Sequence, residues 1–307
     1  MLRFSFHLLV ACFSPSAFAQ LPLRVVDSAS GAPLPYATVL CAEARWLRFA
    51  DSLGRMTVPD SLQGKVFTLT FAGHYPKVLP LTGGGDVALA ALPPLSPVLV
   101  QSCAATQPLT IGTAAAGELE RKIRLRGGID VDDQDLRWTG PVDGAQMAHW
   151  IENPTGKAGW MRSLTFGVHP YFHNKKYLGH ANTPVRLRFF ARGADGMPGE
   201  ELGRNDIVVA AAGFGAFPVA LEAQRIPLPP EGVFVAFELF DAGPDYWWPV
   251  SLPPDASPQA VPEVYGFAFA AHAGGSMYFR NPWMAWTRRS GPACREIALR
   301  IEARVCR

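Results

Sequence analysis

The sequence predicts an all-β protein with two β-sandwiches in tandem, a small one near the N-terminus and a larger, jelly-roll-like one at the C-terminus. Short segments in which apolar and polar residues alternate follow one another along most of the chain, and almost no segment has helical periodicity. The 29 glycines and 28 prolines among 307 residues supply many turns between these segments. With 49% hydrophobic and 18% charged residues, the chain can form a packed core.

The first 19 residues are typical of a secretory signal peptide. Arg3 precedes a short apolar stretch, and Ala17 and Ala19 place small residues where a signal peptidase requires them, so the mature chain is predicted to begin at Gln20. A lipoprotein is the alternative, because the segment that ends at Cys12 resembles a lipobox. Both routes predict export to the periplasm, the outer-membrane surface or the extracellular medium. No later apolar segment is long enough to span a membrane.

Residues 20–100 are predicted to form the small sandwich. Alternating segments at 23–26, 36–41, 65–71 and 77–81 are separated by turns such as Ser28-Ala29-Ser30-Gly31 and Asp51-Ser52-Leu53-Gly54. Gly31 permits the first turn, and Pro33 and Pro35 fix an extended approach to the next strand.

An ordered series of short motifs in this region resembles the carboxypeptidase-regulatory-like family, also called peptidase-associated domains. The motifs are Val26-Asp27, Ser30 to Val39, Asp51 to Arg55, Phe71-Ala72-Gly73-His74-Tyr75 and Leu95 to Val100. The resemblance implies a seven-stranded, transthyretin-like sandwich of accessory character, found in bacterial envelope proteins and ahead of outer-membrane nutrient transporters. It also implies no zinc site, since this domain type accompanies the peptidase and lacks its catalytic metal.

Residues 101–144 are predicted to be a linker, because a basic run at 120–126 and an acidic run at 130–135 interrupt the alternation. The acidic run lacks the glycine and the final glutamate of an EF-hand. Alternation returns at residue 146, so residues 145–307 are predicted to form the larger sandwich. Its clearest strand is the last one, in which Ile297, Leu299, Ile301, Ala303 and Val305 share one face.

Removal of the leader leaves Cys41, Cys103, Cys294 and Cys306, which allow three pairings in an oxidising compartment. The last strand would hold Cys294 and Cys306 about 40 Å apart, so these two are not expected to pair. Cys41 alternates in phase with buried positions and is expected to be a buried free thiol. The sequence does not decide the pairing further.

Charge and motifs exclude several classes of function. The net charge of +2 gives no reason to expect a nucleic-acid partner, and no standard nucleotide-binding or hydrolase motif is present, so no cofactor and no catalytic residue are predicted. His149 and Glu152 have the spacing of a zinc ligand pair, but on a strand they would point to opposite faces. His169 and His173 flank Pro170 and are expected in a solvated loop rather than at a metal.

Aromatic residues near two turns are the candidate ligand-binding residues. Tyr246, Trp247 and Trp248 lie just past a strand, and Trp283 lies in a second turn. Flat rings on sandwich loops can stack on sugar rings, although packing within the protein is the competing interpretation. On an extended backbone Trp247 and Trp248 would project to opposite sides, leaving at most one of them available.

The leading hypothesis is a non-catalytic secreted or cell-envelope protein that acts as a binding or assembly module, with a cell-envelope protein or a glycan as candidate partner. A glycan-binding module and an unrecognised extracytoplasmic hydrolase are the alternatives. A function grafted on a sandwich cannot be inferred from the fold.

Overall fold

The computed structural model describes residues 20–93, 105–113, 143–173, 176–178, 180–203, 207–239, 241, 246–249, 263–269, 271–273, 275–291 and 294–307. No α-helix occurs among these residues, which form strands and two 3-10 turns, η1 (Asp60–Leu62) and η3 (Glu222–Gln224). The protein is therefore all-β, as predicted. None of the described segments is a helix that could cross a membrane. The predicted leader with Cys12, the charged runs of the linker and Cys103 lie outside the described residues.

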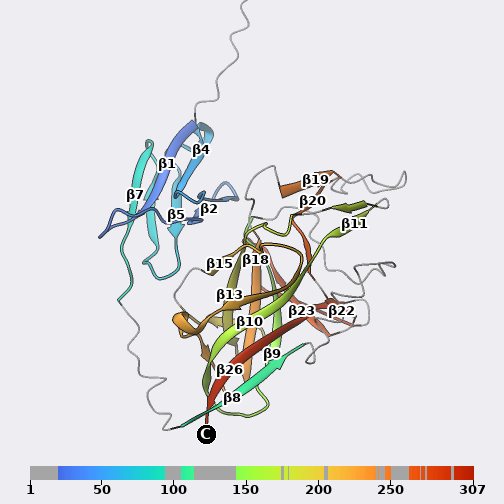
Figure 1. Ribbon diagram of the computed structural model, residues 1–307. Coiled ribbons are helices and arrows are strands. Elements are labelled where there is room, and N and C mark those ends of the chain that lie inside the picture. Colours follow the sequence, from blue (N-terminus) through green and yellow to red (C-terminus); the bar gives the residue numbers. More distant parts are fainter. Residues whose placement is uncertain are drawn as a thin grey trace, which may run out of the picture.

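The described part of the N-terminal region, residues 20–93, forms a small sandwich of seven strands (Figure 1). Its strands are β1 (Gln20–Asp27), β2 (Thr38–Cys41), β3 (Trp46–Phe49), β4 (Arg55–Pro59), β5 (Val66–Thr70), β6 (Lys77–Pro80) and β7 (Gly85–Leu89). One sheet has the order β4-β1-β7 and the other β3-β2-β5-β6. Val25, Val39, Phe67, Leu69 and Leu89 fill the space between the sheets and are fully buried.

Asp27 and His74, from two of the motifs that carry the resemblance, meet in the folded chain. The carboxylate of Asp27 accepts hydrogen bonds from the backbone N–H of Ala29 and Ser30 and lies 3.0 Å from Nε2 of His74. Bonds from the side chain and backbone of Ser30, together with that from His74, hold the pKa of Asp27 well below its ordinary value. The turn after β1 is thereby tied to the segment before β6, which gives these motif residues a structural role.

The larger sandwich consists of two sheets that enclose one core (Figure 1). The first has the order β16-β10-β26-β8, with β17 and β21 also on β10, and the second has the order β14-β13-β18-β9-β23-β24, with β15 also on β13. These strands are β8 (Thr106–Gly112), β9 (Ala145–Glu152), β10 (Gly159–His169), β13 (Val185–Arg192), β14 (Pro198–Glu201), β15 (Ile207–Val209), β16 (Gly215–Ala220), β17 (Pro227–Leu228), β18 (Gly232–Leu239), β21 (Ala268–Phe269), β23 (Ser276–Arg280), β24 (Thr287–Ser290) and β26 (Leu299–Cys306). Phe166 of β10 and Phe237 of β18 meet edge to face in the core, with ring centroids 5.1 Å apart.

Three small ribbons complete the described strands. They are β11 (Tyr171–His173) with β12 (Lys176–Leu178), β19 (Trp247–Pro249) with β20 (Glu263–Tyr265), and β22 (Ala271–Ala273) with β25 (Arg295–Ile297).

The predicted linker is shorter than expected. Thr106–Gly112 forms β8, which pairs antiparallel with β26 from Arg300 to Cys306 and buries Ile111 in the larger core. The sequence of β8 contains Pro108 and only weak alternation, which an edge strand tolerates because one of its sides is unpaired. The larger sandwich therefore begins before residue 145 and takes a strand from the segment assigned to the linker.

The last strand has the face predicted for it, since Leu299, Ile301, Ala303 and Val305 are buried. Cys41 is a buried free thiol, as expected, and Cys294 is also free. Cys306 is disulfide-bonded, and its partner lies outside the described residues. The expectation that Cys294 and Cys306 do not pair is thus confirmed.

Candidate functional site

The predicted aromatic candidates come from two separate hairpins. Tyr246 is half-buried just before β19 and meets the ring of His180 edge to face, with centroids 5.7 Å apart. Trp247 and Trp248 pair through their backbones with Tyr265 and Val264 of β20, and their side chains lie outside the description. Trp283 follows β23 in the turn toward β24, where 39% of its surface is exposed. Trp286, in the same hairpin, is half-buried on the outer face of the larger sandwich against Phe190.

Tyr246 lines a cleft of about 600 Å³ at the junction of the two sandwiches. Its other lining residues are Tyr36, Trp46, Arg48, Phe49, Ala50, Asp51, Ser52, Arg55, Met56, Thr57 and Pro59 from the small sandwich, and Pro184 and Asp241 from the larger one. The volume lies within the range of about 300–1,000 Å³ that is typical of small-molecule sites. Four aromatic rings and charged groups of both signs therefore face one cavity.

Tyr36 is held in the cleft by an unusual backbone conformation. Its φ of 59° lies in the left-handed region, which non-glycine residues seldom adopt. Its N–H donates to the carbonyl oxygen of Asp51 over 3.2 Å, and its own carbonyl oxygen accepts a hydrogen bond from the guanidinium of Arg186. Burial raises the pKa of the Tyr36 phenol, and the neighbouring Tyr246 and Asp51 raise it further, so the hydroxyl is a neutral donor and acceptor at physiological pH.

Two aspartates of the cleft region are fixed by hydrogen bonds. Oδ1 of Asp51 accepts the backbone N–H groups of Leu53 and Arg55, each over 2.8 Å. Asp143 pairs with the guanidinium of Arg48 across the junction and accepts the N–H of Asp241 over 2.9 Å. Burial raises the pKa of Asp143 above its ordinary value. The loss of solvation disfavours the charged carboxylate more strongly than the positive charge of Arg48 stabilises it.

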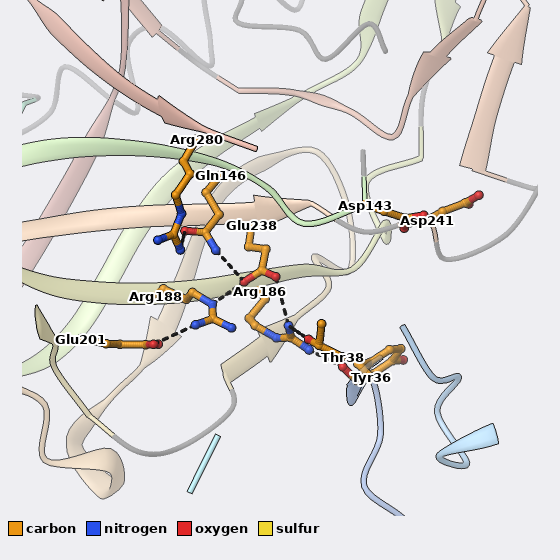
Figure 2. Close-up of polar contacts among 10 residues, drawn as sticks. All are labelled: Tyr36, Thr38, Asp143, Gln146, Arg186, Arg188, Glu201, Glu238, Asp241 and Arg280. Carbon is orange, nitrogen blue, oxygen red and sulfur yellow. Dashed lines mark hydrogen bonds and ion pairs between the residues drawn. The ribbon is translucent and has the colours of Figure 1, made fainter. Parts of the chain in front are cut away.

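A row of polar side chains on the second sheet of the larger sandwich anchors this junction (Figure 2). The cross-strand partners Arg186, Glu238, Gln146 and Arg280 come from β13, β18, β9 and β23 in turn. Glu238 accepts hydrogen bonds from Arg186 over 3.3 Å, from Gln146 over 3.2 Å, and from Arg188. Although burial alone would raise the pKa of Glu238, the charges of Arg188 and Arg186 hold it below its ordinary value.

Arg186 connects this row to the small sandwich. Besides the carbonyl of Tyr36, it contacts the hydroxyl of Thr38 over 3.4 Å, and its guanidinium lies 5.1 Å from the centre of the Phe49 ring. Phe49 and Leu47 are buried and pack in one cluster with Val208 of the larger sandwich. The position of the cleft walls thus depends on a buried ion pair and an apolar contact.

The two histidine arrangements considered from the sequence are described only in part, because the side chains of His173 and His272 lie outside the described residues. His149 is fully buried whereas Glu152 is exposed, so they face opposite sides of β9, and only the backbone of His272 is described. His169 ends β10 and is buried, which corrects the expectation of a solvated loop. Among the described residues, no group of three or more His, Cys, Asp and Glu side chains is placed to hold a metal ion.

Sequence reasoning identified Tyr246 but missed the rest of the cleft. Arg186 and Tyr36 are 150 positions apart, and no local pattern relates them. The one available signal was the presence of Arg186, Arg188 and Glu238 on one face of otherwise apolar strands. No protein-family model matches the chain, and no curated protein is detectably similar to it in sequence.

Proposed function

We propose that the protein is a non-catalytic, exported binding module whose ligand occupies the cleft between its two sandwiches. The observation that carries this proposal is the lining of the cleft, in which Tyr36 and Trp46 of one sandwich face the same cavity as Tyr246 and Asp241 of the other. Rings of this kind supply apolar contact area, and the phenols and carboxylates supply directional hydrogen bonds.

The rigid support of the cleft favours binding over a passive connection between modules. Arg186 uses its buried guanidinium to hold the backbone of Tyr36, and Arg48 pairs with Asp143 at the edge of the cavity. A site whose walls are held before the ligand arrives loses less conformational entropy on binding. The same arrangement suits an assembly module whose partner inserts a side chain or sugar at the junction.

Two observations support export. The leader-like segment 1–19 precedes the first described strand, and Cys306 is disulfide-bonded. Disulfides persist in oxidising compartments, which fits a periplasmic, surface or extracellular protein. The free thiol of Cys41 is compatible with this because it is fully buried.

A thermal-shift screen of the mature protein tests the proposal. Saccharides, short peptides and divalent cations are added separately, since a ligand present at about 100 times its Kd adds about 2.7 kcal/mol to stability. We expect a saccharide or a peptide to raise the melting temperature of the wild type, and the Y246A variant to lose this shift. Y246F retains the ring and is expected to keep most of the shift.

W283A is the matched control, because Trp283 is exposed on another hairpin and does not line the cleft. It should retain the full ligand-induced shift. A shift that is lost in W283A and kept in Y246A would place the site elsewhere and refute the proposal, as would the absence of any shift in the wild type.

A further inference from the structure

The small sandwich has a second cavity, of about 480 Å³, on its sheet β4-β1-β7 (Figure 1). The cavity extends across the three strands, since Thr57 of β4, Arg24 of β1 and Asp86 of β7 all line it. Every described residue that lines it belongs to the small sandwich. Its volume lies within the range of about 300–1,000 Å³ that is typical of small-molecule sites. The small sandwich therefore offers a site of its own, besides the cleft that it shares with the larger one.

Two arginines stand side by side at this cavity. The register of β1 and β4 places Arg24 directly opposite Arg55, and the register of β1 and β7 places it beside Asp86. Leu23 and Val25, the neighbours in β1, are buried between the sheets, so Arg24 lies on the outer face together with these two partners. Cβ atoms of directly opposite residues are about 4.5–5.5 Å apart, and like charges at this separation repel each other. The arrangement therefore favours an anion between the two guanidiniums.

The protein neutralises this arginine pair only in part. Nη1 of Arg24 lies 3.7 Å from Oδ2 of Asp86, which is longer than a hydrogen bond, and the Asp86 side chain is 59% exposed. An ion pair so open to water contributes little. Within the part of the chain that the structure describes, Nε of Arg24 has no acceptor, and the guanidinium of Arg55 forms no hydrogen bond or ion pair. Both guanidiniums therefore retain donors for the oxygens of an anion.

The negative charges at the cavity favour a monoanion. Asp51 and Asp86 line it as well, so a phosphate ester with about two negative charges would meet two carboxylates besides the two arginines. A carboxylate has a single charge, and each of its two oxygens can accept a hydrogen bond from one guanidinium. Thr57 and Asp86 are exposed on the same sheet and can exchange hydrogen bonds with hydroxyl groups of the ligand. A sugar acid has both kinds of group.

We infer that this cavity binds a sugar acid, whose carboxylate bridges Arg24 and Arg55. The hydroxyl groups of the sugar bond to Thr57 and Asp86, and the C–H groups of its ring pack on Pro22, which is paired with Thr57. Arg55 and Thr57 also line the junction cleft, whereas the other three residues line only this cavity. The site is therefore a second one, beyond the proposed function, and its test depends on Arg24.

Isothermal titration of the mature protein with glucuronate tests the inference. Glucose has the same ring without the charge, and glucose 6-phosphate carries more negative charge, so these two sugars are the control ligands. We expect glucuronate to bind at least about tenfold more tightly than either of them. Its binding should weaken as salt is added, because ions screen the exposed arginines.

Two substitutions should change the affinity for glucuronate in opposite directions. R24M removes one guanidinium and keeps much of the length of the side chain, so it should weaken binding about tenfold or more. D86N should strengthen binding severalfold, because the amide no longer competes for Arg24. R289M is the matched control, since Arg289 is also a solvent-accessible arginine on a strand and lies outside both cavities. It should bind glucuronate as the wild type does.

Thermal denaturation without ligand separates a loss of binding from a loss of folding. The melting temperature of R24M should be no lower than that of the wild type, because the substitution removes the repulsion from Arg55 and only an exposed ion pair with Asp86. A clearly lower melting temperature would show that the two arginines do not repel each other, and it would overturn the inference.

Other outcomes overturn the inference and leave the proposed function intact. Glucuronate that binds R24M and R289M with equal affinity is not held by the arginine pair. Binding that is lost in Y246A and kept in R24M would place the carboxylate in the junction cleft. Glucose 6-phosphate that binds more tightly than glucuronate would refute the ligand class, and so would the absence of glucuronate binding by the wild type.

Discussion

Glu238 is a buried carboxylate whose charge is balanced by two arginines. The side chain of Glu238 is 4% exposed, and that of Arg186 is also 4% exposed. Arg186 and Arg188 both form ion pairs with this carboxylate. An ion pair removed from water gains little net stability, but loss of one partner leaves the other charge uncompensated in a medium of low dielectric. The network therefore contributes more to the position of Arg186, and through it of Tyr36, than to overall stability.

We expect E238Q to lower the free energy of unfolding by about 3–5 kcal/mol, because the amide retains the shape but not the charge that Arg186 and Arg188 require. Urea denaturation at neutral pH measures this. E201Q is the matched control, since Glu201 also pairs with Arg188 but its side chain is 41% exposed. It should cost less than about 1 kcal/mol. Equal losses in the two variants would contradict the role assigned to Glu238.

His149 is buried and neutral in the larger core. Burial lowers its pKa from 6.5 to about 3, and Nε2 accepts the N–H of Ile297 over 3.4 Å. Between these two pKa values the unfolded chain binds a proton that the folded protein does not. Stability must therefore decrease as the pH falls below about 6.5, by as much as about 1.4 kcal/mol per pH unit, until the folded-state pKa is reached.

Removal of this group should make the acid side of the stability profile less steep. We expect H149Q to show a smaller decrease in the free energy of unfolding between pH 6.5 and pH 4 than the wild type, whatever its stability at neutral pH. Urea titrations at several pH values measure the slope. An unchanged slope would show that His149 does not account for the sensitivity to acid.

At the scale of the elements, the contact between β10 and β26 shows why one glycine is required. A Cβ atom on Gly159 would lie 2.0 Å from the carbonyl oxygen of Arg304, which is backbone and cannot move aside. Gly159 is the first residue of β10 and pairs with Val305 of β26. The pairing of β10 with β26 at this end therefore requires glycine, which has no side chain, at position 159.

G159A is expected to destabilise the protein by about 1–3 kcal/mol, as overpacking does elsewhere. G213A is the control, since a Cβ atom there would meet nothing within 4 Å. Its effect should be neutral or slightly stabilising, because alanine restricts the unfolded chain. Thermal denaturation compares the two variants, and a G159A protein as stable as G213A would show that β10 and β26 separate at this end without cost.

The junction makes the two sandwiches more dependent on each other than two domains on a linker would be. Leu47 and Phe49 are buried in a cluster that includes Val208 of the larger sandwich, and Arg186 bonds to the backbone of the smaller one. A separated small sandwich would expose these two side chains. We nonetheless expect residues 21–100 to fold without the rest of the chain, because Val25, Val39 and Phe67 belong to a core that the small sandwich forms by itself.

The boundaries of the larger sandwich can be tested with fragments. A fragment of residues 105–307 contains β8, whereas residues 140–307 lack it and leave β26 unpaired on one side. We expect the longer fragment to unfold cooperatively at a higher temperature, because Ile111 and Leu109 pack against the core. Equal melting temperatures would mean that β8 is dispensable and that the linker extends to β9, as the sequence suggested.

The sequence by itself determined the fold class, most strand positions and the buried state of Cys41. These features follow from alternation along single segments, which fixes the face that each strand must bury. β26 is the clearest case, since its apolar residues repeat at every second position. β8 escaped detection because an edge strand with Pro108 needs little alternation to pair.

Only the tertiary structure decided where a ligand could bind. The cleft unites Tyr36 and Trp46 with Tyr246, and the row that supports it unites β13, β18, β9 and β23. Strand order and the docking of one sandwich on another depend on contacts between segments far apart in the chain. A local pattern specifies which face of a strand is buried, but it does not specify which strand lies beside it, so the partners of Arg186 became known only from the folded protein.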